Sequence, residues 1–198
     1  MPADGPSVGP VRAAHSLYPV RMPSLVPPTV DVHESFLAAM DEYVAEGRGG
    51  LDDFSNIGND LRAYASTWAT ADGFARYVDY LLAQRLEETP RPPGFVPTTV
   101  LWWLDGPIYL GRLNIRHRLA PGQAGERNGH IGYDVRPGAR RRGHATAMLA
   151  AALPLAATLG LPRVLITCDF DNEASRRTIE RNGGRPADRR DEKLRYWL

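Results

Sequence analysis

The stretch from Ile131 to Cys168 constrains the fold of this chain most. Two apolar runs, 131–135 and 164–168, flank an arginine-rich loop and an alanine-rich segment of helical length. A strand, a helix and a second strand of these lengths make a βαβ unit, in which the strands are parallel and the crossover is right-handed. The second run lacks the alternation of a half-exposed strand, which is typical of a strand buried on both faces. We therefore expect an α/β fold.

The loop inside this unit has the composition of an anion-binding site. Three consecutive arginines, Arg140 to Arg142, precede Gly143 and the start of the helix. Backbone N–H groups at a helix start lack intrahelical acceptors and carry the positive end of the helix dipole. Glycine lets the backbone approach a ligand closely, and guanidinium groups match phosphate oxygens. From these residues alone, three interpretations stay open: the loop binds an anionic cofactor, it binds a nucleic acid, or it binds no anion.

The rest of the chain divides into a helical part and a sheet-forming part. We expect a flexible tail over 1–15, which is rich in Pro and Gly, and a single domain over 16–198. A proline-rich connector at 90–97 separates the helical part, 16–97, from the sheet part, 98–198. The expected elements are an edge strand within 17–26, helices near 31–46, 61–68 and 72–88, a hairpin of 98–104 and 108–115, a Gly-rich loop at 120–129, strands at 130–135, 164–168 and 195–198, and helices at 144–159 and 173–182.

Composition narrows the partners and the location. The formal net charge of +1 gives no argument for nucleic acid or an anionic membrane. The single cysteine, Cys168, excludes an internal disulfide and is expected to pack in its apolar run. Asp169, Asp171 and Glu173 are explained better by capping of the last helix than by a metal site. We expect a cytoplasmic protein without a membrane span, a nucleic-acid partner or a metal.

In this order of elements, the arginine loop carries a family motif. Arg140, Gly143 and Ala145 match the pattern of Arg or Gln, two residues, Gly, one residue, then Gly or Ala, and Val135-x-Pro137 matches the usual lead-in. This pattern resembles the pyrophosphate motif of the GNAT superfamily of acyl-CoA-dependent N-acyltransferases.

A second motif follows the next expected strand. Members of the superfamily often have Asn-x-x-Ser at the start of a helix that ends in Asn-Gly, and Asn172, Ser175 and Asn182-Gly183 have this spacing. The resemblance covers roughly 98–198. Two motifs that flank a βαβ unit are much more specific than the loop motif alone.

The resemblance implies a fold, an activity and a binding site. The fold is GNAT-like, with a central twisted mixed sheet, helices on both faces and a parallel strand pair around the cofactor cleft. The implied reaction is direct transfer of an acetyl group from acetyl-CoA to a primary amine of a small molecule or peptide in a ternary complex, without a metal, and homodimers are frequent in the family. The implied cofactor-binding residues are Asp134, Val135, Arg140, Arg141, Arg142, Gly143, His144, Ala145, Asn172 and Ser175.

The catalytic residues depart from the common family pattern. Many members have a Tyr on the last helix that protonates the leaving thiolate, and Ile179 occupies that position here. The general acid is therefore absent, supplied elsewhere, or unnecessary, since a thiolate of pKa about 8.5 leaves readily. His130 and His117 are candidate bases, because deprotonating an amine of pKa about 10.4 at neutral pH costs roughly 4 to 5 kcal/mol.

Tyr133 completes the candidate catalytic set, because a strand N–H near Tyr133 or Asp134 is the natural donor to the oxyanion. The missing Tyr also keeps an alternative function open, that of an acyl-CoA-binding sensor without catalysis.

Overall fold

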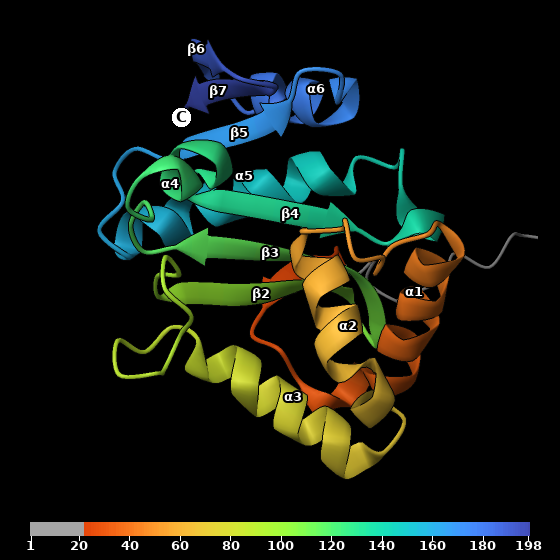
Figure 1. The fold of residues 1–198 in the computed structure, drawn as a ribbon. Helices are drawn as coiled ribbons and strands as arrows, with labels where there is room; N and C mark the ends of the chain where they lie inside the picture. Colours follow the sequence, from red (N-terminus) through yellow and green to blue (C-terminus); the bar gives the residue numbers. More distant parts are fainter. Residues whose placement is uncertain (1–21) are drawn as a thin grey trace, which may run out of the picture.

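The computed structural model describes residues 22–198, which form two antiparallel sheets with helices packed around them (Figure 1). The expected tail at 1–15 lies outside the described residues. The strand order is β1-β2-β3-β4 in the first sheet and β5-β7-β6 in the second. The strands are β1 (Ser24–Val26), β2 (Thr98–Asp105), β3 (Ile108–Arg116), β4 (Ile131–Val135), β5 (Leu165–Asp169), β6 (Arg185–Arg190) and β7 (Lys193–Trp197). The helices are the 3-10 turns η1 (Val30–Val32) and η2 (Pro137–Ala139), and α1 (His33–Ala45), α2 (Asn56–Trp68), α3 (Ala71–Ala83), α4 (Gln123–Asn128), α5 (His144–Thr158) and α6 (Glu173–Arg181).

Helices cover both faces of the first sheet, which confirms the expected α/β class. Alternate side chains of β2 point to opposite faces, as the pleat of a strand requires. Trp102 lies in an apolar core with α1, α2 and α3, whereas Trp103 lies in a second core with α5. The expected edge strand is confirmed as β1, which borders the sheet beside β2 (Figure 1).

The expected parallel strand pair is not confirmed. The arrows of β4 and β5 point the same way in Figure 1, but the two strands belong to different sheets. They touch where β4 begins, because the backbone N–H of His130 donates to the Leu165 carbonyl at 2.7 Å. The N–H of Leu165 donates at 2.9 Å to Nδ1 of His130, a side-chain acceptor in place of a backbone carbonyl. Beyond this contact β4 pairs with β3 and β5 pairs with β7, so both sheets are antiparallel and no mixed sheet forms.

Several element boundaries differ from the expectation. Helix α2 begins earlier than expected because the Ser55 side chain accepts the N–H of Gly58 at 3.0 Å and caps it. The stretch expected to be a Gly-rich loop contains α4. Strand β6 was not expected, since all its residues are exposed and give no apolar periodicity. In the part of the chain that the structure describes, no helix has the length and apolar character that a membrane crossing requires.

A buried ion pair ties α2 to the first sheet. The guanidinium of Arg112 on β3 contacts the carboxylate of Asp60 on α2, with side chains only 6% and 13% exposed. Tyr77 on α3 donates to the same carboxylate at 2.8 Å. In the strand register Arg112 lies opposite Asp134 of β4. The pair therefore fixes α2 over the stretch of β3 and β4 that borders the functional site.

Candidate active site

The arginine loop, defined here as residues 136–143, connects β4 to α5. The backbone of Arg141 has φ +63° and that of Gly143 has φ +84°, so the chain turns through two left-handed residues. Such turns expose concave runs of N–H groups that bind anions. Gly143 is the N-cap of α5 and contributes no side chain, so the first turn of that helix has no side-chain cap. A Cβ at Gly143 would meet nothing within 4 Å, which leaves space for a ligand beside these donors.

Helix α1 holds this loop in place through a carboxylate. Glu42 accepts hydrogen bonds at 2.8 Å from Nε of Arg136 and at 2.8 Å from the backbone N–H of Gly138. The bond from Arg136 lowers the pKa of Glu42. The sequence analysis did not connect α1 with the loop, because the partners are far apart in the sequence and no motif links them.

The arginines of the loop have different roles. Arg140 forms an ion pair with Glu46 at 2.7 Å and donates from Nε to the Val135 carbonyl at 3.0 Å. Its side chain therefore stabilises the loop itself. Arg141 and Arg142 are exposed beside the start of α5. The next residue, His144, accepts a hydrogen bond at Nδ1 from the Trp103 indole at 3.3 Å, and burial lowers its pKa.

Tyr133 and α6 face each other across the space between the sheets. The Tyr133 hydroxyl lies 2.8 Å from Oγ of Ser175. Asn172 caps α6 by accepting the N–H of Ser175 at 3.0 Å. Burial raises the pKa of Tyr133 to about 12, so its hydroxyl stays protonated at neutral pH. Ile179 is fully buried in the core beneath α6, so its position offers no polar group.

The two candidate histidines, His130 and His117, form hydrogen bonds to groups within the fold. His130 is buried, its Nδ1 is occupied by the Leu165 N–H, and burial lowers its pKa. Nε2 of His117 lies 2.8 Å from Oγ1 of Thr99, and burial lowers its pKa as well. Neither histidine lines the cavity described next.

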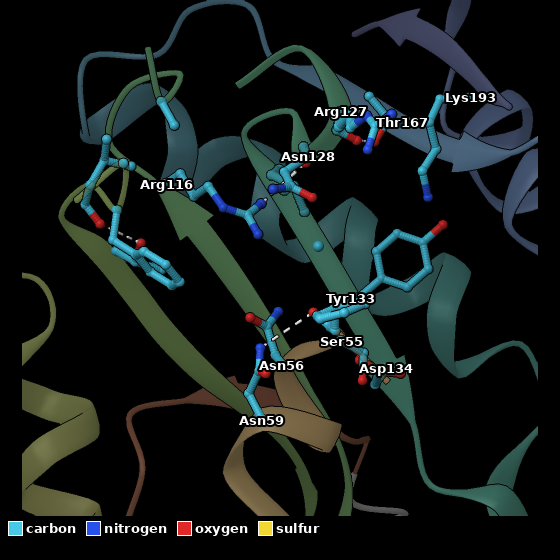
Figure 2. A pocket seen from close by; sticks show the side chains of 18 of the residues that line it. Ser55, Asn56, Asn59, Arg116, Arg127, Asn128, Tyr133, Asp134, Thr167 and Lys193 are labelled. Carbon is cyan, nitrogen blue, oxygen red and sulfur yellow. Dashed lines mark hydrogen bonds between the residues drawn. The ribbon is translucent and has the colours of Figure 1, made fainter. Parts of the chain in front are cut away.

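A polar cavity of about 320 Å³ lies beside β4, between α2 and the second sheet (Figure 2). Asp134, Tyr133 and Gly132 of β4 form part of its wall. The remaining lining residues come from the start of α2, the connector before β2, the end of β3, the region of α4, and the second sheet. They include Phe54, Ser55, Asn56, Asn59, Phe95, Val96, Arg116, Arg127, Asn128, Thr167 and Lys193.

The Asp134 carboxylate is held at this cavity by the loop between α1 and α2. Nη1 of Arg48 lies 3.5 Å from Asp134, and Nε of Arg48 lies 2.8 Å from Asp53. Arg48 also donates to the hydroxyl of Ser55, the N-cap of α2. Burial raises the pKa of Asp134 despite the nearby guanidinium. Sequence analysis missed Arg48; its position among Gly47, Gly49 and Gly50 was the available signal.

The arginine loop at the start of α5 and the polar cavity both adjoin one strand, β4. The family profile described as "Acetyltransferase (GNAT) domain" matches residues 51–185, which is more than half of the chain. The chain therefore belongs to the GNAT acetyltransferase family, and it is an acetyltransferase enzyme. No curated protein sequence matches it significantly.

Solved structures share this fold at low sequence identity. RimJ of Mycobacterium smegmatis in complex with CoA-disulfide has a TM-score of 0.60 at 17% identity, covering 88% of this chain and 80% of that one. RimL, a ribosomal L7/L12 alpha-N-protein acetyltransferase in complex with coenzyme A, has 0.56 at 17%, covering 91% and 96%. The microcin C7 self-immunity acetyltransferase MccE, in complex with acetyl-CoA and AMP, has 0.54 at 14%, covering 88% and 90%.

Proposed function

We propose that this enzyme transfers an acetyl group from acetyl-CoA to a primary amine by direct attack in a ternary complex. The observation that carries the proposal is the position of Tyr133. This residue contacts α6 across the space between the sheets and also lines the polar cavity. Tyr133 therefore adjoins both the expected cofactor cleft and the cavity that we propose as the second binding site. The complexes of RimL with coenzyme A and of MccE with acetyl-CoA support the choice of cofactor.

The residues around the cleft fit acetyl-CoA. The backbone N–H groups from Arg141 to Ala145 would hold the pyrophosphate, with the exposed guanidinium groups of Arg141 and Arg142 adding positive charge. Among the described residues, the edge of β4 opposite β3 has no strand partner beyond the contact of His130 with Leu165, so its backbone groups are available to the pantetheine. Asn172 and Ser175 form the opposite wall. Acetyl-CoA supplies the thioester that makes the acetyl carbon electrophilic.

We assign the proton chemistry to β4. Tyr133, protonated at neutral pH, is placed to donate a hydrogen bond to the leaving sulfur, the task of the tyrosine that Ile179 replaces. Asp134 lines the cavity and is the carboxylate best placed to accept a proton from the amine. In this proposal His130 positions the main chain at Leu165 and His117 contacts the Thr99 hydroxyl. Neither acts as a base, because both lie outside the cavity lining.

The test measures release of free CoA from acetyl-CoA with a panel of amines. We expect Tyr133→Phe to lower kcat about 100-fold or more, the range of a single positioned donor, with an unchanged KM for acetyl-CoA. Tyr80→Phe, on the outer side of α3, is the matched control and should have no effect. An unchanged kcat in Tyr133→Phe contradicts the assigned role of Tyr133.

The second candidate function is an acyl-CoA-binding sensor. The buried Ile179 favours it, because the helix position that carries the acid in many relatives is apolar here. Tight binding of CoA without turnover of any amine in the panel would favour the sensor.

A further inference from the structure

Arg116, the last residue of β3, extends its side chain over the neighbouring strand at Gly132. A Cβ built at Gly132 would lie 3.8 Å from Nη1 of Arg116 and 3.9 Å from Nδ2 of Asn56. Figure 2 shows this guanidinium and this amide directed toward the same stretch of β4. Since glycine has no side chain, the space between these two donor groups and the strand stays open to the cavity.

Among the side chains that the structure describes, Arg116 differs from the other cationic groups of the cavity in having no carboxylate partner. Lys193 pairs with Asp169 at 2.6 Å, and Arg127 pairs with Asp191 at 3.2 Å. Among the described residues, the recorded partners of the Arg116 guanidinium are the carbonyls of Asn128 at 3.1 Å and Gly129 at 3.3 Å.

Both of these bonds come from Nη1 of Arg116, which leaves the N–H groups of Nη2 and Nε available to donate to a ligand. Burial, together with the charge of Arg112, lowers the pKa of the Arg116 guanidinium. A desolvated charge without a counter-ion is costly, and a bound anion would remove that cost.

The cation and the proposed amine site lie at a defined spacing. Gly132 and Asp134 are two residues apart on one face of β4, which places them about 7 Å apart along the strand. We infer that the cavity selects amines that also carry an anionic group, a carboxylate or a phosphate, which Arg116 binds above Gly132 while the nitrogen lies near Asp134. This inference rests on the proposed acetyl transfer to amines.

Two phenylalanines indicate that the acceptor also has an apolar portion. Phe54 is 82% exposed and Phe95 is 66% exposed, and both line the cavity from loops. Large apolar side chains left exposed at a pocket commonly mark a ligand contact. An amino acid with an apolar side chain combines all of these features.

The test compares amines that differ only in the anionic group. Suitable pairs are L-phenylalanine with L-phenylalaninamide, γ-aminobutyrate with its amide, and O-phosphoethanolamine with ethanolamine, and a Gly-Glu dipeptide against Gly-Gln tests an acidic peptide. We expect the native enzyme to prefer the anionic member of at least one pair about 10-fold or more in kcat/KM, as loss of a charge-assisted bond predicts. The pair that shows the preference identifies the source of the anion.

Variants of the pocket separate recognition from stability. Arg116→Gln should abolish the preference within each pair, Arg116→Lys should retain part of it, and Arg118→Gln, an exposed neighbour, should leave it unchanged. Gly132→Ala should reduce turnover of the anionic member, because its Cβ fits at van der Waals distance but occupies the anion space. An equal loss for both members of a pair in Arg116→Gln would mean that Arg116 only supports the fold, and would overturn the inference.

Binding provides a second measurement that does not need turnover. In the presence of CoA, the anionic amine should raise the Tm of the native protein but not that of Arg116→Gln. Turnover without any anionic preference overturns the inference and leaves the proposed function intact. Absence of turnover with every amine refutes the proposed function, and the Tm shift then decides the inference by itself.

Discussion

Replacing Glu42 with Gln tests whether α1 holds the arginine loop in its conformation. Gln keeps the size of the side chain but removes the charge that accepts from Arg136 and from the Gly138 N–H. Hydrogen bonds to a charged group contribute about 1.5 to 3 kcal/mol and neutral ones about 0.5 to 1.5, so each bond loses about 1 kcal/mol. The side chains of Arg136 and Glu42 are 18% and 32% exposed, so solvent screening reduces the total. We expect a loss of about 1 to 2 kcal/mol in the free energy of unfolding.

This loss corresponds to a fall in Tm of about 2 to 8 °C for a domain of this size. The assays are thermal unfolding and measurement of the Kd for CoA. This Kd should rise because Gly138 lies in the arginine loop. Asp41→Asn is the matched control, since Asp41 is an exposed carboxylate on the same helix.

The pH dependence gives an independent check of the same pair. The folded state lowers the pKa of Glu42 from 4.5, so the ionised carboxylate stabilises the protein above that pH. The stabilisation is lost as the pH falls through the lowered pKa, because the carboxylate then becomes protonated. The stability difference between the native protein and Glu42→Gln should therefore be complete at neutral pH and shrink below about 4.5. A stability difference that is constant down to pH 3 refutes the proposed role of Glu42 in holding the arginine loop. A CoA affinity of Glu42→Gln equal to that of Asp41→Asn refutes it as well.

Two further variants test the loop and the support of the site. Gly143→Asp should weaken CoA binding about 10-fold or more by placing a carboxylate beside the phosphates. Gly160 is a similarly open glycine with φ +82°, so Gly160→Asp should lower only the free energy of unfolding, by the backbone strain of about 1 to 2 kcal/mol. Equal CoA affinity in the two folded variants would contradict the loop assignment. Asp60→Asn should lower the free energy of unfolding by about 3 to 5 kcal/mol, because Arg112 is left buried without its counter-ion. Urea unfolding measures this, and a loss below about 1 kcal/mol would show that the pair contributes little.

The local structure of the proposed cofactor site was predictable from the sequence because its determinants are local. Gly143 at the helix start needs a left-handed backbone, and the observed φ of +84° agrees with that need. Asn172 caps α6 three residues before Ser175, and this contact depends on sequence spacing alone. Backbone conformation and capping act over a few residues, so a short motif is enough to specify them.

The cavity that we propose for the acceptor was decided by tertiary structure. Nothing local to Arg116 indicates that its side chain crosses β4 above Gly132, because that depends on strand register. Nor does the sequence reveal that the His130 side chain accepts the N–H of Leu165 where β4 and β5 meet. The chain by itself determined the order of the elements and the loop at the start of α5. The packing of distant segments decided which charges are paired, which are buried alone, and where the cavity opens, because burial and Coulomb interactions depend on distance in space.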